Sequence, residues 1–303
     1  MITLETARPY LRAHRGALFV VKVGGECLAT PERVRRVARE LAMIDSLGAR
    51  LVILHGAGPQ TDALLRARGE APRKIAGRRV TTESALRALQ HASYGEVGPS
   101  FAAALCAAGV DALPLAAGAA GVLRASRRPP QRIDGERVDF GEVGLVDHVE
   151  AEVLHGLLHS EFVPVLSLPA SDGLGGFLNV NADLAAAHVA AALGARKLVL
   201  ATAAEGILSH ANDPNSLCSN LTVEQLDALE SEGGLQGGML VKAAAIRLAL
   251  EGGVERVHVV SGLRDGALIG ELYTAHGTGT LITRDPCEEA ACAPRPKLVE
   301  VAL

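Results

Sequence analysis

The chain has 303 residues, enough for one large domain or two modest lobes. Hydrophobic residues make up 49% of it, but aromatic residues only 3% and tryptophan is absent, so the core must consist mainly of alanine, valine and leucine. The formal net charge of −4 argues against the basic surface that drives non-specific nucleic-acid binding.

Nothing in the sequence favours a membrane or an oxidising compartment. The longest apolar run, residues 184–193, is shorter than the roughly 18 residues of a membrane span, and the N-terminus lacks the apolar stretch of a signal peptide. The five cysteines, at positions 27, 106, 218, 287 and 292, include no CxxC pair. We therefore expect a cytoplasmic protein with idle or buried thiols and no protein-held metal.

Buried strands and amphipathic helices alternate along the chain. Continuous apolar runs predict strands at 17–23, 51–54, 111–115, 163–168, 197–201, 256–260 and 280–282. Helical spacing predicts helices from Pro31, from about Pro59, and over 182–193, 222–230 and 240–251. The polar, proline-rich segment 124–143 is typical of a hairpin or flap outside the core. The alternation predicts an α/β fold, with a mostly parallel sheet covered by helices on both faces.

Three glycine-rich loops lie next to strands or helices, namely KVGGE at 22–26, HGAGPQ at 55–60 and GGLQGGM at 233–239. Glycine lets the backbone approach a phosphate closely, and a helix N-terminus attracts anions. Strand-to-helix turns need glycine in any case, so either of the first two loops alone is equally consistent with a structural role. Neither is a P-loop or a complete dinucleotide-binding fingerprint.

Two lysines next to Gly-Gly pairs are notable because the chain otherwise prefers arginine. Only five of its thirty basic residues are lysine, yet Lys22 and Lys242 each lie close to a pair of glycines. An ammonium group on a flexible stem suits a moving phosphoryl group better than a rigid guanidinium does. This pattern indicates phosphate contacts for both lysines.

The motifs KVGGE, HGAGPQ, GRRVT at 77–81, LNVNAD at 178–183 and GGMLVK at 237–242 occur in this order, followed by HGTGTLI at 276–282. Together they resemble the amino-acid kinase family, and within it the N-acetylglutamate kinases, over about residues 17–284. The resemblance implies a three-layer αβα sandwich around a mostly parallel, roughly eight-stranded sheet. It also implies a single domain over 1–303, with an acyl-amino-acid lobe at about 17–180, a nucleotide lobe at about 181–284 and a tail at 285–303.

The activity that the resemblance implies is phosphorylation of the side-chain carboxylate of N-acetyl-L-glutamate by ATP with Mg²⁺, the second step of arginine biosynthesis. A carboxylate is already ionised at neutral pH, so no general base is needed and His55 is interpreted as structural. Mg²⁺ dehydrates reluctantly, so ATP phosphates and water would hold it rather than protein ligands.

The resemblance also assigns residue roles. Lys22 and Lys242 would contact the phosphates as catalytic residues, and Asp183 would orient both lysines. The substrate contacts would be Gly56, Ala57, Gly58, Arg79, Asn179 and Asn181, with Arg79 on the substrate α-carboxylate. The nucleotide contacts would be Lys22, Gly24, Gly25, Thr202, Gly206, Gly238, Met239 and Lys242. The glycines at 24, 25, 56 and 58 would donate backbone N–H groups. The residues alone leave Arg79 open as part of a solvated basic cluster and Asn181 open as a helix cap.

The sequence departs from the usual pattern of these kinases at four places. Ala57 replaces a glycine, Gly98-Pro99 replaces Asn-Lys, residues 117–120 lack a Gly-Asp pair, and Thr202-Ala203 replaces Thr-Asp. HGAGPQ, LNVNAD and the missing Thr-Asp resemble the kinase domain of bifunctional N-acetylglutamate synthase-kinases, and the opening PYLRAHRG resembles the corresponding domain of the synthases. Those proteins carry an acetyltransferase domain after this one, for which 303 residues leave no room, so we expect either a stand-alone kinase of that subgroup or a separated piece.

Two alternative functions stay open at this point. One is a catalytically weak domain that binds an amino acid or arginine and regulates a separate acetyltransferase, which the missing carboxylate at position 203 favours. The other is a kinase of the same fold for another acylated glutamate or for aminoadipate. A helix at 6–14 would allow arginine feedback inhibition in a homo-oligomer. No nucleic acid or membrane is expected as a partner.

Overall fold

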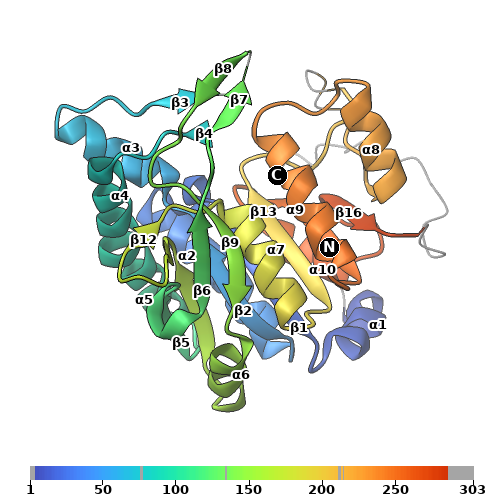
Figure 1. Cartoon of the computed structure of the whole chain (residues 1–303). Helices are drawn as coiled ribbons and strands as arrows, with labels where there is room; N and C mark the ends of the chain where they lie inside the picture. The colour runs from blue at the N-terminus through green and yellow to red at the C-terminus, as the bar shows by residue number, and fades with distance from the viewer. Residues whose placement is uncertain (1–3, 76–77, 134, 211–212, 214, 286–303) are drawn as a thin grey trace.

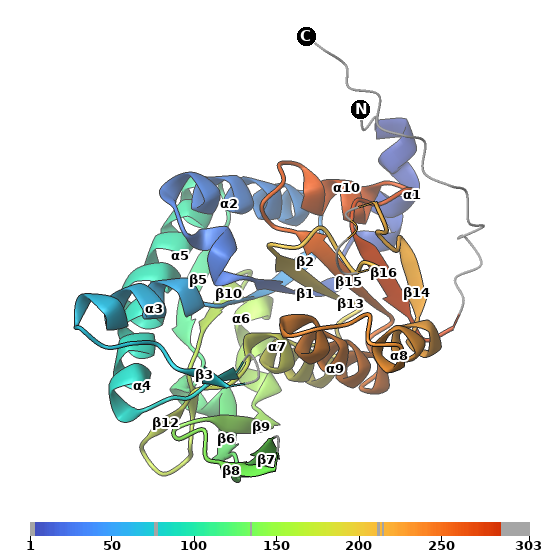
Figure 2. The ribbon, with the colours of Figure 1, turned by 90° about the horizontal axis from the view of Figure 1, so that it is seen from above.

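The computed structural model describes residues 4–75, 78–133, 135–210, 213 and 215–285. One eight-stranded sheet lies between two helix layers (Figure 1 and Figure 2). Its strand order is β14-β16-β15-β13-β1-β2-β10-β5, and all neighbours are parallel except β15 and β16. The predicted α/β sandwich with a mostly parallel sheet is confirmed.

The strands of this sheet are β1 (Leu18–Val23), β2 (Arg50–His55), β5 (Ala112–Ala116), β10 (Val163–Ser167), β13 (Lys197–Thr202), β14 (Asn220–Thr222), β15 (Arg256–Ser261) and β16 (Thr280–Thr283). All are predicted from apolar runs except β14. That strand has only three residues, and of these only Leu221 is buried, so it has no apolar run to reveal it. Thr222 ends β14 and caps the next helix, α8.

Alternate residues of the central strands face two separate hydrophobic cores. In β1, Val20 belongs to the first core, while Phe19 and Val21 belong to the second. The first core lies beneath α6 (Ala151–His159), α7 (Ala182–Ala192) and α9 (Gly238–Glu251). The second lies beneath α2 (Pro31–Ser46), α5 (Gly98–Ala107) and α10 (Ala267–Tyr273). Because side chains alternate along a strand, Lys22 of β1 points to the same face as Val20, toward α7 and α9.

The remaining helices are α1 (Leu4–His14), α3 (Gly58–Ala67), α4 (Glu83–Gln90) and α8 (Val223–Ser231). Short 3₁₀ turns occupy Gly25–Leu28 and Ala119–Gly121, and a π-helical segment, η2 (His91–Val97), joins α4 to α5. The predicted helices are confirmed. Thr30 caps α2, because its hydroxyl accepts from Arg33 N at 3.3 Å. Helix α9 begins two residues before its predicted start at 240.

The segment 124–143 is partly a hairpin and partly core. Strands β7 (Gln131–Ile133) and β8 (Glu136–Val138) form a hairpin that projects from the molecule (Figure 1). However, β6 (Leu123–Arg127) pairs with β9 (Gly144–Val149), and Ala125 and Phe140 are buried. The prediction that the whole segment lies outside the core is therefore wrong, because its many arginines obscure single buried positions between them.

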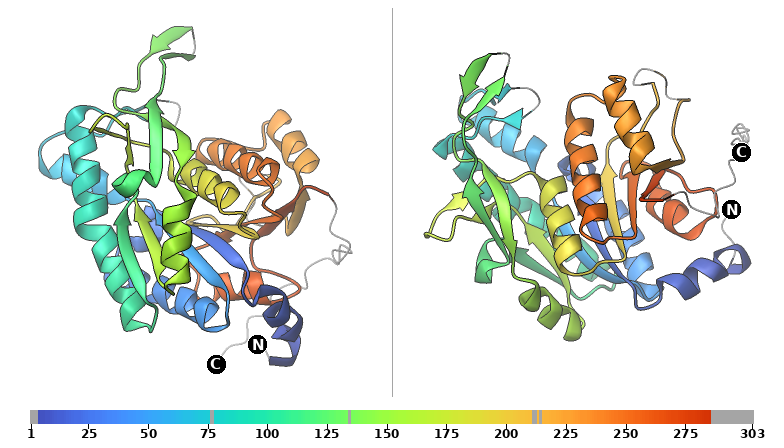
Figure 3. Two further views of the ribbon diagram at one scale, coloured as in Figure 1. Left: turned by 60° about the horizontal axis from the view of Figure 1, so that its bottom comes forward. Right: turned by 45° about the vertical axis from the view of Figure 1, so that its right-hand side comes forward.

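Strands β6 and β9 belong to a second, four-stranded sheet with β11 (Ala170–Ser171) and β12 (Phe177–Leu178). Strands β3 (Lys74–Ile75) and β4 (Arg78–Arg79) form a further hairpin. Figure 3 shows α1 on the opposite side of the molecule from the β7–β8 hairpin. No helix of the described part of the chain is long and apolar enough to cross a membrane.

The division into two lobes stays a prediction, although strands from both proposed lobes share the large sheet, where β1 lies next to β13. The predicted tail falls outside the described residues except for Asp285, as do Cys287 and Cys292. Cys27, Cys106 and Cys218 are free thiols.

Candidate active site

The predicted site residues gather at the carboxyl ends of the parallel strands. Val23 at the end of β1 lies beside His55 of β2 and Ala201 of β13, so the loops that follow these strands leave the sheet together. In open α/β sheets, ligands bind in the crevice outside the carboxyl ends of the strands. The topology alone therefore brings motifs from residues 22 to 206 to one edge.

At this edge one carboxylate lies between two ammonium groups. Lys22 Nζ is 2.8 Å from Asp183 Oδ1, and Lys242 Nζ is 2.9 Å from Asp183 Oδ2. The three side chains are only 9%, 7% and 11% exposed for Lys22, Asp183 and Lys242 respectively. The structure thus brings together the three predicted catalytic residues from β1, α7 and α9.

Local sequence explains how Asp183 and Lys242 are placed. Asn181 caps α7, because its Oδ1 accepts from the backbone N–H groups of Asp183 at 2.9 Å and Leu184 at 3.1 Å. This puts Asp183 in the first turn, where the helix dipole also favours a negative charge. The buried face of α7 is mostly alanine, and α7 packs against α9, which carries Lys242.

Lys22 and Asp183 hold each other in their charged forms. Burial, the largest single influence, would lower the pKa of Lys22, but the attraction and hydrogen bond to Asp183 outweigh it and raise that pKa. Burial would likewise raise the pKa of Asp183, yet Lys22 and Lys242 together bring it down to about 2. Two positive charges against one negative leave a buried net positive charge, which suits a phosphate.

The loops at 24–25 and 56–58 touch each other, which explains their glycines. A Cβ on Gly25 would lie 2.9 Å from Pro59 Cδ, and one on Gly56 would lie 3.2 Å from Gly25 N. Gly24 N donates to Ala201 O, and Gly56 N donates to Val23 O, each at 2.9 Å. The predicted N–H donation to a ligand is therefore wrong for Gly24 and Gly56, whose N–H groups extend the sheet.

Ala57 and Gly58 are better placed to donate. They are the N-cap and the first residue of α3. The first N–H groups of a helix have no partner within it, and they attract anions. A Cβ at Gly58 would meet nothing within 4 Å, so this position faces open space. The prediction of N–H donation stays in place for Gly25 and Gly58.

Arg79 does not belong to a solvated basic cluster. Its side chain is only 12% exposed, against 52% for Lys74, and it forms an ion pair with Asp62. One of its nitrogens also donates to Gly58 O at 3.2 Å, which places it beside the HGAGPQ loop. Its other terminal nitrogen, Nη1, is buried and has no hydrogen-bond partner among the described residues. Such a group fits an anionic ligand.

Asn179 and Asn181 have different roles. Asn179 Nδ2 donates to Thr81 Oγ1 at 2.9 Å, which joins the LNVNAD motif to the GRRVT motif. Asn181 is exposed, and its oxygen is occupied by capping. Sequence reasoning missed Asp62 and Thr81, which hold Arg79 and Asn179. Thr81 lies within a quoted motif, but no local signal links either residue to its distant partner.

The residues predicted for the nucleotide lie at the ends of β13 and at the start of α9. Thr202 ends β13, and the backbone oxygen of this residue accepts from Gly262 N at 2.7 Å. Gly206 is buried, and a Cβ there would lie 2.6 Å from Leu217 Cδ1, so it is needed for packing. Gly238 and Met239 open α9, and a Cβ on Gly238 would meet nothing within 4 Å.

The sequence of the chain matches a known protein family. The sequence pattern of the amino acid kinase family matches residues 17–261. The chain belongs to the amino acid kinase family. It is 38% identical over 297 residues to an acetylglutamate kinase from Myxococcus xanthus, with 96% of each chain covered. It is also 38% identical over 283 residues to an acetylglutamate kinase from Symbiobacterium thermophilum, with 93% of this chain and 96% of the relative covered.

Solved structures of amino acid kinase folds agree with this. The N-acetylglutamate synthase from Neisseria gonorrhoeae, complexed with coenzyme A and N-acetyl-glutamate, superposes with a TM-score of 0.81 at 30% identity. The match covers 94% of this chain but only 63% of the synthase chain. The same synthase complexed with coenzyme A and L-arginine has a TM-score of 0.78 at 31% identity, with 93% and 65% covered. Carbamate kinase from Giardia lamblia, bound to AMP-PNP, shares the fold, with a TM-score of 0.65 at 16% identity and 89% and 99% covered.

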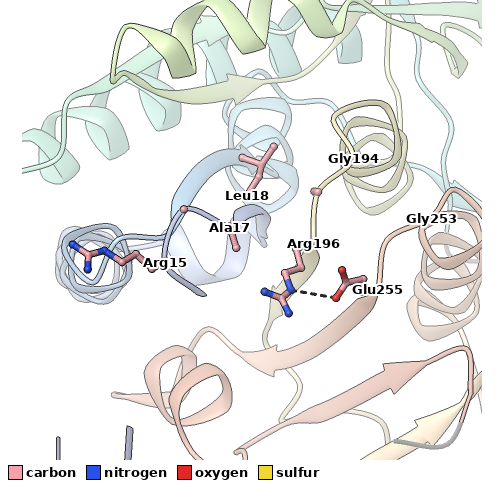
Figure 4. Close-up of a pocket in the computed structure, with 9 residues that line it drawn as sticks. Arg15, Ala17, Leu18, Gly194, Arg196, Gly253 and Glu255 are labelled. Carbon is pink, nitrogen blue, oxygen red and sulfur yellow. Dashed lines mark hydrogen bonds and ion pairs between the residues drawn. The ribbon is translucent and has the colours of Figure 1, made fainter. Parts of the chain in front are cut away.

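A pocket of about 490 Å³ lies elsewhere in this amino acid kinase, at the amino-terminal ends of β1 and β13. Figure 4 shows Arg15, Leu18, Arg196 and Glu255 around it, with Arg196 and Glu255 joined by an ion pair of 3.2 Å. None of the predicted site residues lines it. The charged cluster at the opposite ends of the strands is therefore the candidate site of this family member.

The ion cluster should make the free energy of unfolding fall as the pH is lowered. The pKa of Asp183 is about 2 in the folded chain and near its ordinary value of about 3.9 when unfolded. Its carboxylate therefore stabilises the fold above about pH 4, and this contribution is lost as the pH falls through about 2. We expect the unfolding free energies of wild type and Asp183→Asn to converge by about 2 kcal/mol between pH 5 and pH 2.

Urea titrations across this pH range check the expectation. Asp265→Asn, which removes an exposed carboxylate, serves as the control for the loss of one charge. A difference between wild type and Asp183→Asn that stayed constant, or widened, as the pH fell would contradict the account.

Proposed function

We propose that the protein is an ATP-dependent N-acetylglutamate kinase, which phosphorylates the side-chain carboxylate of N-acetyl-L-glutamate in the second step of arginine biosynthesis. The observation that carries the proposal is the buried Lys22–Asp183–Lys242 cluster in a chain so similar to two acetylglutamate kinases. The proposal places the enzyme in the cytoplasm and includes a homo-oligomer as a prediction.

The chemical difficulty of this reaction is electrostatic, because an anionic carboxylate must approach an anionic γ-phosphate. Phosphoryl transfer is catalysed mainly by positioning and by charge stabilisation. Lys22 and Lys242 supply the positive charge at the phosphates, and Asp183 holds both ammonium groups in place. Such donors are preorganised, so no reorganisation is needed as charge moves in the transition state.

The substrate would bind on the side of α3 and β4. Arg79 offers to the substrate α-carboxylate its buried Nη1, which has no hydrogen-bond partner in the described part of the chain, while Asp62 fixes its orientation. Arginine suits this task because its planar fork matches a carboxylate. Asn179, held by Thr81, would contact the acetylated amino group. Asn181 would act indirectly, through the cap that positions Asp183.

The nucleotide would bind on the side of β13 and α9. The N-terminus of α9 is open at Gly238 and attracts phosphate, whereas Met239 N donates to Gln236 O at 3.0 Å. Thr202 lies at the end of β13. Mg²⁺ would be carried by the ATP phosphates and water, and there it would neutralise phosphate charge. Position 203 holds alanine, but the same loop carries Glu205, whose carboxylate pairs with Arg264 at 3.0 Å.

The first test is turnover itself. We expect ATP-dependent ADP release with N-acetylglutamate, and less with acetylaminoadipate or glutamate, in a coupled assay. Lys22→Ala and Asp183→Ala should abolish or severely reduce it, because either change removes charge or position at the phosphates. Wild-type rates in both variants would refute these catalytic roles. A wild-type chain that released no ADP with any of the three substrates would instead favour the regulatory alternative.

The second test separates the two substrates. We expect Arg79→Ala to raise KM for N-acetylglutamate at least about tenfold and to leave KM for ATP nearly unchanged, because a charge-assisted contact to a carboxylate is lost. Arg78→Ala is the matched control, since the neighbouring Arg78 contacts Gln131 instead. An unchanged KM for N-acetylglutamate in Arg79→Ala would remove that residue from the site.

We also propose that L-arginine inhibits the enzyme by binding beneath α1. The His14 ring packs edge-on against Phe19 and Tyr273, each at 5.0 Å between centroids. His14 Nδ1 and Tyr273 OH are buried without a hydrogen-bond partner in the part of the chain that the structure describes. Next to them, Glu271 accepts from His258 Nδ1 at 2.8 Å. A similar synthase was solved in complex with L-arginine, which supports arginine as the ligand.

Arginine should inhibit wild-type turnover at millimolar concentrations. We expect Tyr273→Phe to weaken the inhibition and to leave the uninhibited rate unchanged, because only one hydroxyl near α1 is removed. Initial rates measured against arginine concentration check this. Equal inhibition of both proteins would remove Tyr273 from the site, and no inhibition of wild type would end the proposal.

A further inference from the structure

The buried pair of His55 and Ser167 lies directly behind the HGAGPQ loop, and neither phosphate nor substrate contacts explain it. His55 ends β2 and immediately precedes Gly56, Ala57 and Gly58, and its side chain is fully buried. Its Nε2 lies 2.7 Å from the hydroxyl of Ser167, the adjacent residue in register on β10. Burial lowers the pKa of His55 to about 4, so the imidazole is neutral at physiological pH.

The partners of the two ring nitrogens determine the tautomer. Nδ1 faces the carbonyl oxygen of Gly56 at 3.4 Å, and a carbonyl can only accept a hydrogen bond. Nδ1 of the neutral ring must therefore carry the proton. Nε2 is then the acceptor, and the Ser167 hydroxyl donates to it. The pair forms a chain that runs from Ser167 through His55 to the Gly56 carbonyl.

These hydrogen bonds also set the direction of the N–H group of Ala57, the residue after Gly56. In a planar trans peptide the C=O and N–H groups point in opposite directions. A Gly56 carbonyl drawn toward His55 therefore turns the Ala57 N–H away from the ring. Ala57 is the N-cap of α3, so this N–H belongs to the helix end beside Arg79 and the proposed substrate.

Gly98 makes room for the pair. A Cβ at Gly98 would lie 2.4 Å from Ser167 Oγ and 3.2 Å from His55 Nε2, so any side chain would displace the serine hydroxyl. Gly98 directly follows the π-helical segment η2, and its N–H donates to Ser93 O across the wide turn. Wide turns of this kind are rare and often occur at functional sites. Here the wide turn brings a glycine against the polar pair.

We propose that His55 is a positioning residue, which Ser167 locks in the Nδ1–H tautomer so that the Gly56–Ala57 peptide presents the Ala57 N–H to the substrate carboxylate. The inference rests on the proposed kinase activity. It gives a role in that activity to three residues that lie behind the HGAGPQ loop, namely His55, Ser167 and Gly98. They act through the orientation of one peptide group.

Kinetics of Ser167→Ala test the proposal. We expect kcat/KM for N-acetylglutamate to fall about tenfold or more, because small misplacements of a binding group are costly, while KM for ATP changes less than about twofold. Tyr94→Phe is the matched control. It removes a half-buried hydrogen bond of 2.7 Å, from Tyr94 OH to Pro169 O, near the same strand end without touching His55.

Two outcomes of this comparison are distinguishable from failure of the kinase assignment. If wild type turns over and Ser167→Ala behaves like Tyr94→Phe, with stability lost but kinetics unchanged, the positioning role is overturned. An equal loss toward N-acetylglutamate and ATP would overturn it too, since the pair would then be merely structural. A wild type without turnover would concern the proposed function only.

A double-mutant cycle adds a second, independent readout. Gly98→Ala should reduce kcat/KM for N-acetylglutamate in wild type, because its methyl group displaces the Ser167 hydroxyl. In the Ser167→Ala background the same change should cost much less, because the bond it breaks is already absent. Fully additive effects would contradict the shared mechanism.

The tautomer can be read without any activity. Nitrogen-15 NMR of the imidazole-labelled full chain should show His55 as neutral, with the proton on Nδ1, at neutral pH. In Ser167→Ala that resonance should shift or broaden, because Nε2 loses its hydrogen bond to the serine hydroxyl, whereas Tyr94→Phe should leave it unchanged. A proton on Nε2 in the wild-type protein would overturn the proposal.

Discussion

The architecture of this protein depends on one ionic constraint, namely that two ammonium groups are buried together at the edge of a sheet. Lys22 and Lys242 would repel each other there, and each would be costly to bury alone. Asp183 removes the difficulty by forming an ion pair with each, at 2.8 Å and 2.9 Å. The rest of the fold serves to bring these three side chains from β1, α7 and α9 to a common point.

Several features follow from this constraint. A parallel sheet is needed because only carboxyl ends that meet at one edge bring the loops after β1, β2 and β13 together. Alanine dominates the buried face of α7, so that α9 can approach and deliver Lys242. Asn181 caps α7 and thereby fixes Asp183. Beside the HGAGPQ loop, Asp62 orients Arg79 as Asp183 orients the lysines.

Local patterns in the sequence predict much of this but not its long-range contacts. Continuous apolar runs reveal the buried strands, because both faces of a parallel sheet are covered. The glycine loops are recognisable, yet the sequence does not distinguish Gly24 and Gly56, whose N–H groups extend the sheet, from Gly58, which opens a helix. The partnerships Arg79 with Asp62, Asn179 with Thr81 and His55 with Ser167 each join distant segments, so no periodicity indicates them.

The central claim is that Asp183 positions two cations for phosphoryl transfer rather than binding ATP itself. The most direct measurement is a single-turnover rate of phosphate transfer from ATP to N-acetylglutamate by Asp183→Asn, together with ATP affinity of the same protein. We expect nearly unchanged ATP affinity and a transfer rate lower by about a hundredfold or more, because the ammonium groups lose their position. A wild-type transfer rate at saturating ATP would contradict it.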